Sequence, residues 1–185
     1  MKTQQILKIT LASIFAGIFS INSAYAGGNV SLFYGVKSLD EVEWDPVEEQ
    51  EEIGIMLDFN AGGLPVNIAI DYLTSDDTGD YLGNTYKGET TELNIGVRKY
   101  LDENKAFVPY IGGGIAFIEG TFSGLGLSQT DDATGFWANA GINWMVSNQF
   151  HIGADLRVSS ADITLFGVDA DAGGTHVGVT AGVSF

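Results

Sequence analysis

The sequence contains no cysteine, only three prolines and only eight lysines and arginines in 185 residues. Without cysteine, the chain can hold neither a disulfide scaffold nor a cysteine-ligated zinc site. The 24 aspartates and glutamates give a formal net charge of −16, which excludes nucleic-acid binding through a basic face. With 45% hydrophobic residues, the composition also differs from that of a disordered acidic chain. The length predicts one domain or at most two.

Long apolar runs are scarce, and the one present lies near the N-terminus. Lys2 and Lys8 form a basic region before the apolar stretch Ile9–Ile21. Ala24-Tyr25-Ala26 supplies the small-x-small pattern of a cleavage site. The stretch has about 13 residues, fewer than the ~20 that a membrane helix needs. We therefore predict a signal peptide over residues 1–26 and one mature domain over residues 27–185.

From Gly27 onward, apolar residues alternate with small or polar residues in eight segments. A period of two is typical of β-strands whose two faces meet different surroundings. In one segment, for example, Ile53, Ile55 and Leu57 share a face. The predicted strands are Val30–Lys37, Glu52–Asn60, Pro65–Leu73, Glu89–Leu101, Ala106–Glu119, Thr134–Val146, Phe150–Ser159 and Gly174–Phe185.

The face opposite the apolar one distinguishes a soluble β-sandwich from a membrane barrel. A sandwich would expose many charged residues there, whereas this face carries mainly Gly, Ala, Asn and Ser with a few charges, which is typical of a narrow barrel interior. Most segments are close to the ~9–11 residues that cross a bilayer as a tilted strand. Aromatic residues near the segment ends predict two interfacial girdles: Phe59, Phe107, Trp144 and Phe185 at one level, and Tyr72, Phe117 and Phe136 at the other.

Short and long connections alternate between the predicted strands. The short ones cover residues 61–64, 102–105 and 147–149, and the long ones are Ser38–Glu51, Thr74–Gly88, Gly120–Ala133 and Ser160–Gly173. Short periplasmic turns and long extracellular loops are typical of outer-membrane barrels. A closed barrel also pairs every backbone group that would otherwise be unsatisfied in lipid. The predicted fold class is therefore all-β: an eight-stranded antiparallel up-and-down transmembrane β-barrel.

Three parts of the sequence resemble the small eight-stranded outer-membrane barrels of the OmpA/OmpX type. They are Pro109–Ile115, Gly153–Arg157 and the last strand, in which Val179, Ala181 and Val183 alternate before Phe185. The resemblance covers the mature chain and implies the outer membrane of a Gram-negative bacterium as the location. It also implies that Phe185 belongs to a C-terminal signal read by the barrel-assembly machinery. It implies no chemical activity.

Eight charged residues are predicted to face the barrel interior, where charges must pair. Asp155 and Arg157 share a strand face, and Glu92 or Asp71 could complete a network with Arg157. Because an eight-stranded interior is just wide enough for side chains, we favour a filled lumen over a narrow ion-conducting channel. The eight residues are Lys37, Glu52, Asp58, Asp71, Glu92, Arg98, Asp155 and Arg157.

The four long connections hold 15 of the 24 acidic residues, and Lys87 is their only base. We interpret them as a solvated, charge-repelling rim, with weak calcium or magnesium binding, or docking of a basic partner, as the alternatives. Four acids of the first connection are the candidates for cation contact: Asp40, Glu41, Glu43 and Asp45. Aromatic and apolar residues in these connections are either contact anchors or packing between loops: Trp44, Tyr81, Phe122 and Leu165-Phe166.

An enzyme of the lipid-A-modifying kind would need a serine, a histidine and an acid. The sequence offers His176 with Ser159 or Ser160 and Asp155 or Asp162, but His176 is predicted to face the lumen, whereas a lipid-cleaving site opens to the bilayer. We therefore predict a non-enzymatic barrel without a cofactor, with a structural or surface-binding role in adhesion or envelope integrity. A narrow channel and a lipid-A-modifying enzyme are the alternatives.

The expected surroundings of the barrel follow from this location. They are outer-membrane lipid and lipopolysaccharide, the assembly machinery that inserts it, and an extracellular ligand held by the long connections. The acidic balance excludes nucleic acid as a partner, and the barrel is expected to be a monomer.

Overall fold

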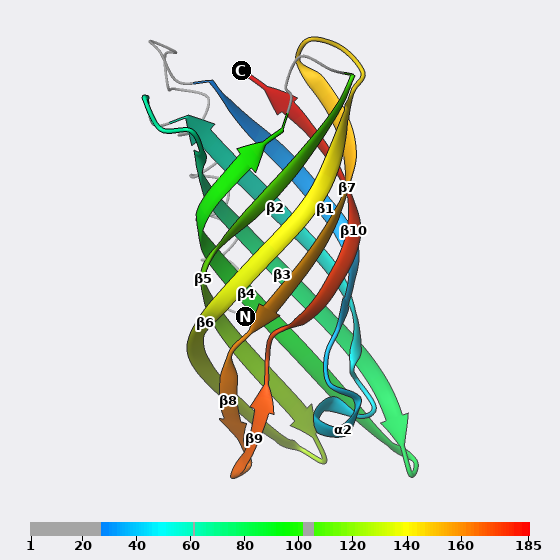
Figure 1. Ribbon diagram of the computed structural model, residues 1–185. Helices are drawn as coiled ribbons and strands as arrows, with labels where there is room; N and C mark the ends of the chain where they lie inside the picture. The colour runs from blue at the N-terminus through cyan, green and yellow to red at the C-terminus, as the bar shows by residue number, and fades with distance from the viewer. Residues whose placement is uncertain (1–26, 61, 102–105) are drawn as a thin grey trace, which may run out of the picture.

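The computed structural model describes residues 27–60, 62–101 and 106–185, and in these ranges eight strands close into one antiparallel barrel (Figure 1). Around the barrel the order is β1-β10-β7-β6-β5-β4-β3-β2. The predicted fold class is confirmed, while the predicted signal peptide lies outside the described residues. The barrel strands are β1 (Gly28–Ser38), β2 (Glu49–Asn60), β3 (Asn67–Tyr81), β4 (Asn84–Tyr100), β5 (Phe107–Gly124), β6 (Leu127–Met145), β7 (Phe150–Ser160) and β10 (Gly174–Ser184).

Strand β1 closes the barrel because it pairs on both of its edges. It pairs with β2 from Gly28↔Phe59 to Ser38↔Glu49, and with β10 from Asn29↔Ser184 to Ser38↔Thr175. Every barrel strand therefore has two neighbours, which leaves no open sheet edge in the bilayer.

The side chains alternate between the two faces of the barrel as the sequence predicts. Leu32 and Leu156 on the apolar face are 57% and 51% exposed, whereas Lys37 and Asp71 on the other face are fully buried. The apolar face is therefore the outer one, and the polar face fills the lumen. In the girdle predicted at the short-turn end, the rings of Phe107 and Trp144 stack at 6.2 Å.

Two connections that the sequence predicted as loops, Thr74–Gly88 and Gly120–Ala133, are instead long hairpins. The β3–β4 pairing continues to Tyr81↔Asn84, and the β5–β6 pairing continues to Gly124↔Leu127. The hydroxyl-rich segments favour this because their side chains hydrogen-bond across the strands, as Thr121 and Thr130 do at 2.8 Å. Strands β3 to β6 have 15 to 19 residues, so they project beyond the ~9–11 that a bilayer accommodates.

The other two predicted loops also contain regular structure. Ser38–Glu51 contains the short helix α2 (Glu41–Trp44), and Ser160–Gly173 contains the hairpin β8 (Asp162–Leu165) and β9 (Val168–Asp171). Asp40 starts the helix because its side chain accepts a hydrogen bond from the Val42 amide at 2.8 Å. These elements and the two long hairpins gather at the end opposite the short turns (Figure 1). No helix within the described ranges has the length and apolar character needed to span a membrane.

Three of the outer hairpins turn on the same two-residue pattern, an apolar residue followed by glycine. Leu82, Leu125 and Phe166 have φ values of 50°, 53° and 53°, and the glycines that follow have φ values of 79°, 78° and 78°. Such turns favour Asn-Gly or Asp-Gly, because both central residues need positive φ. A bulky apolar residue at this position is strained.

Replacing these apolar turn residues with asparagine is expected to stabilise the barrel. Asparagine tolerates positive φ, so Leu82→Asn and Leu125→Asn should each raise the free energy of unfolding by about 1 kcal/mol, measured by urea titration in detergent micelles. Leu64→Asn, at an exposed leucine of a short turn without positive φ, is the matched control and should change little. A loss of stability in the tip variants would show that the turns are not strained.

Candidate functional site

The first interior layer is built around Asp71 of β3. Its Oδ2 accepts hydrogen bonds from Arg98 Nη2 at 2.7 Å and from Arg157 Nη2 at 2.6 Å. All three side chains are at most 1% exposed. One carboxylate therefore joins arginines from β4 and β7 across the lumen.

Two further aspartates belong to this layer, and both accept hydrogen bonds from neutral side chains. Asp58 Oδ2 accepts from the Tyr100 hydroxyl at 2.6 Å and lies 3.4 Å from Arg98 Nη1. Asp155 Oδ2 accepts from the Tyr110 hydroxyl at 2.8 Å and from Asn139 Nδ2 at 2.7 Å. The layer thus holds three carboxylates against two guanidinium groups, and the hydroxyl and amide donors stabilise the additional negative charge.

A second layer, nearer the outer end, is built around Lys37 of β1. Its ammonium group donates to Glu92 Oε1 at 2.8 Å, to Thr90 Oγ1 at 2.9 Å and to the Ala172 carbonyl at 2.7 Å. The side chain is fully buried. All three ammonium protons thus have acceptors, which is the condition for burying a charged lysine at an acceptable free-energy cost.

His176 lies in the same layer, between two glutamates. Its Nδ1 is 2.9 Å from the Glu52 carboxylate, and its Nε2 is 2.9 Å from Ser159 Oγ. The Ser159 hydroxyl donates to Glu92 Oε1 at 2.9 Å. The Ser159 hydroxyl thus lies within hydrogen-bond distance of both Glu92 Oε1 and His176 Nε2. Glu52, His176 and Ser159 therefore follow one another in the order of an acid, a base and a hydroxyl, but all three are buried inside the lumen.

All eight charged residues predicted for the interior lie inside the barrel, none more than 3% exposed. Glu92 or Asp71 was expected to complete a network with Arg157, and Asp71 is the one that contacts it. Asp155, on the same strand face as Arg157, lies 3.9 Å from Arg157 Nε. Glu92 pairs with Lys37 instead. For Ser159 and His176 the acid is Glu52, not Asp155 or Asp162. The sequence reasoning missed Tyr100 and Tyr110 as partners, although their inward parity could have indicated them.

An apolar cluster covers the outer mouth of the lumen. Trp44 of α2 is fully buried, and its Nε1 donates to the Asp171 carbonyl at 2.9 Å. The cluster is linked to the charged layer below, because the neighbouring Ala172 carbonyl accepts from Lys37. Trp44 is therefore packing rather than an exposed contact anchor. The principal members of the apolar cluster are Leu39, Trp44, Val47, Ile118, Ile163, Leu165 and Ala172, with Phe122 partly buried against them.

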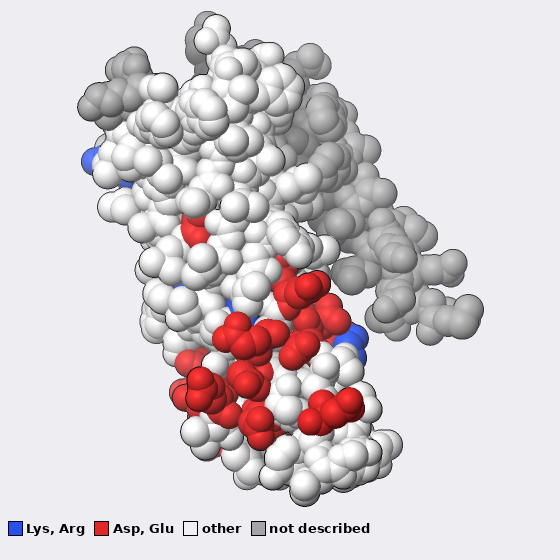
Figure 2. Space-filling view, turned by 90° about the vertical axis from the view of Figure 1, so that its right-hand side faces the viewer, with Lys and Arg blue, Asp and Glu red and all other residues white. Residues whose placement is uncertain are grey.

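Acidic side chains gather on the outer half of the molecule, the half that carries α2 in Figure 1 (Figure 2). Lys87 lies among them, 2.8 Å from Glu89 and 3.7 Å from Asp76. The hydrogen bond with Glu89 raises the pKa of Lys87 above its usual value. Because these side chains are 42 to 63% exposed, such pairs contribute less than about 1 kcal/mol each.

The four candidates for cation contact lie on or beside α2. Asp40 caps the helix and Glu43 Oε2 accepts from the Asp171 amide at 2.7 Å, while Glu41 and Asp45 lie between and after them. Within residues 27–60, 62–101 and 106–185, no three histidine, aspartate or glutamate side chains are arranged to hold a metal ion. Two of the four acids thus have structural partners in the chain itself.

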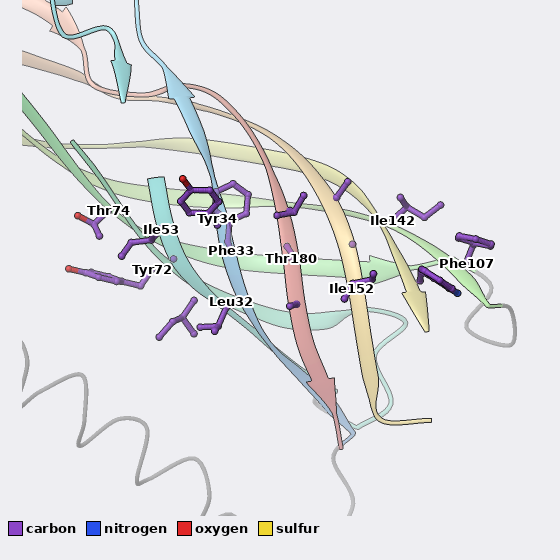
Figure 3. A pocket seen from close by; sticks show the side chains of 17 residues that line it. Leu32, Phe33, Tyr34, Ile53, Tyr72, Thr74, Phe107, Ile142, Ile152 and Thr180 are labelled. Carbon is purple, nitrogen blue, oxygen red and sulfur yellow. The ribbon is translucent and has the colours of Figure 1, made fainter. Parts of the chain in front are cut away.

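A hollow of about 870 Å³ lies against the outer face of the barrel (Figure 3). Most of its lining is apolar and outward-facing, including Leu32, Ile53 and Ile152 on different strands. The hollow thus belongs to the surface that meets acyl chains. At the end of the chain, Phe185 pairs with Gly28 through backbone hydrogen bonds of 2.9 and 3.0 Å, and the residue is 53% exposed.

Solved structures of outer-membrane proteins share this fold at low sequence identity. Neisserial surface protein A is 12% identical with a TM-score of 0.62, over 86% of this chain and 97% of that one. Ail of Yersinia pestis, solved with the heparin analogue sucrose octasulfate, is 14% identical with a TM-score of 0.59, over 86% and 99%. OprG of Pseudomonas aeruginosa is 13% identical with a TM-score of 0.59, over 86% and 95%. A search of curated proteins finds no match.

The model of the outer membrane protein beta-barrel domain family matches residues 12–185. Its match covers all eight barrel strands, and the structural relatives come from the outer membranes of Gram-negative bacteria. The chain therefore belongs to the outer membrane protein beta-barrel domain family and is an outer-membrane protein of a Gram-negative bacterium.

Proposed function

We propose that this barrel is a non-conducting membrane anchor that presents its outer end to an extracellular partner. Its expected surroundings are outer-membrane lipid and lipopolysaccharide, it acts as a monomer, and Phe185 takes part in recognition by the barrel-assembly machinery. The role is structural or adhesive rather than one of transport.

The observation that carries the proposal is the filled lumen. The two charged layers leave Asp71, Arg98 and Arg157 at most 1% exposed, and the apolar cluster around Trp44 covers the outer mouth. An ion path would require these pairs to separate inside a narrow barrel, and each separated charge would be buried without its partner. The described residues thus favour a closed interior over a narrow channel.

Planar-bilayer recordings test this proposal. The purified barrel is expected to give no stable single-channel steps at moderate voltage, whereas a wide porin in the same bilayers serves as the positive control. Stable steps whose ion selectivity changes with Arg157→Gln would contradict the proposal, because that change would place the current in the lumen. Conductance steps whose ion selectivity is the same in the parent and in Arg157→Gln would point to a contaminating channel. Such steps should disappear when the recording is repeated with independently refolded protein.

We also propose that the barrel is not an enzyme. Ser159 and His176 are enclosed in the lumen, 8% and 0% exposed, so the hydroxyl has no access to lipid. A fluorophosphonate probe for activated serines should therefore leave the folded protein unlabelled. Labelling that disappears in Ser159→Ala, but persists in the exposed-site control Ser128→Ala, would overturn this prediction.

The charge of the outer end indicates the class of partner. Ail was solved with a polysulfated ligand, but the four outer connections of this chain carry 15 acids and one lysine. Such a surface repels sulfate and phosphate groups. The ligand expected here is therefore cationic.

A further inference from the structure

The tips of the three outer hairpins carry large apolar side chains that face solvent. Leu82 is 84% exposed, Leu125 is 67% exposed and Phe166 is 51% exposed. An apolar neighbour accompanies each of them: Tyr81 at 51%, Leu127 at 63% and Val168 at 63% exposure. We call these six side chains the tip surface.

The three tips are held side by side rather than hanging independently. The first two hairpins stay paired almost to their turns, since Tyr86 of β4 lies opposite Gly124 of β5. The third hairpin is bound to the second through Gln129, whose Oε1 accepts from the Phe166 amide at 2.7 Å. Asp131 Oδ2 also accepts from the Thr164 amide at 2.7 Å. The three tips are therefore fixed relative to one another at the outermost end of the barrel.

Packing within the protein does not account for these side chains. Trp44 and Phe122, apolar residues of the same outer end, pack into the cluster above the lumen. The tip residues do not, and three of them occupy turn positions with positive φ at which asparagine would be less strained. Strain retained together with apolar exposure is typical of sites that serve binding.

Acidic residues surround the tip surface. Asp80 lies next to Tyr81, Asp169 next to Val168, and Asp131 on the strand between the second and third tips. A partner must therefore combine an apolar face with positive charge around it. Anionic lipid and lipopolysaccharide carry the wrong charge for this combination.

We propose that the tip surface docks a cationic amphipathic polypeptide, whose apolar side chains pack against the three tips while its lysines and arginines pair with the acids behind them. The proposal deepens the proposed function, since it names the partner class of the presented end. The two can fail separately, because conductance reports on the lumen and binding reports on the tips.

The test uses the full barrel in phosphatidylcholine nanodiscs. The probe is a fluorescent helical peptide with leucines on one face and lysines on the other, and empty nanodiscs give the background. The peptide should bind the parent barrel above this background. The triple variant Leu82→Asn, Leu125→Asn, Phe166→Asn should bind at least about tenfold more weakly, while its heat-induced gel shift shows that it is folded. Leu64→Asn at the opposite end should bind as the parent does.

Two further probes separate the contributions of charge and of lipid. A peptide with glutamate in place of each lysine should not bind, and phosphatidylcholine vesicles should not sediment with the barrel. Equal binding by the parent and the triple variant, no binding above empty nanodiscs, or equal binding of the glutamate peptide would each overturn the proposal. Capture of the vesicles that depends on the tips would also overturn it and would assign the surface to a lipid membrane.

Discussion

Replacing Asp71 with alanine is expected to destabilise the barrel by about 3–5 kcal/mol, because it leaves two buried guanidinium groups without their shared carboxylate. Arg98 and Arg157 contact the same Asp71 oxygen at 2.7 and 2.6 Å. The loss would appear as a lower urea midpoint in detergent micelles and a lower temperature for the gel shift of the folded form.

The matched control for this variant is Asp76→Ala on the same strand. Asp76 is 63% exposed and lies 3.7 Å from Lys87, so its removal should change the free energy of unfolding by less than about 1 kcal/mol. Equal effects of the two variants would mean that the interior layer is hydrated and weakly coupled. The description of a closed lumen would then be wrong.

The second large effect is expected from Trp44→Ala. Trp44 is fully buried at the centre of the apolar cluster over the lumen, and removing such a side chain typically costs about 3–5 kcal/mol. The loss should be confined to the outer end, because the barrel strands retain their ladders. Added protease should then cut the outer end in intact cells, whereas the parent protein resists.

Val42→Ala is the control for the tryptophan variant. Val42 lies in the same short helix and is 92% exposed, so its truncation should leave protease resistance unchanged. If both variants resist protease as the parent does, the outer end does not depend on Trp44. The covering cluster would then not be a stable part of the fold.

Alternation made the barrel predictable from the sequence because a bilayer and a narrow lumen impose opposite demands on successive residues. That same parity placed Asp71, Arg98 and Arg157 inside. Which charges meet could not be predicted, since this depends on how the strands stagger around the barrel. Glu92 reaches Lys37 across the lumen, 55 residues away in the chain, rather than Arg157.

The outer end was less predictable because its composition is typical of loops. Thr74–Gly88 is rich in aspartate, threonine and glycine, yet it forms a hairpin because neighbouring strands extend alongside it and supply hydrogen-bond partners. The burial of Trp44 likewise depends on Ile118 and Ile163, which lie far away in the sequence. Tertiary contacts of this kind override local propensity.

The lumen and the outer end differ in how their charged and apolar side chains are paired and exposed. Inside, almost every charge has a partner from the protein. Outside, strained apolar turns face solvent and acidic side chains gather around them. The molecule is thus interpreted as a rigid stem whose interior holds the strands in register and whose tips make contact.

Spin labels on the outer face test the central inside-out arrangement most directly. Because the chain has no cysteine, single cysteines at Ile55, Val97 and Leu156 can each carry one nitroxide in lipid bilayers. All three labels should collide strongly with dissolved oxygen and weakly with a water-soluble nickel chelate, as expected for sites in contact with acyl chains. Labels shielded from both reagents would place these residues in a protein core and would contradict the barrel's orientation.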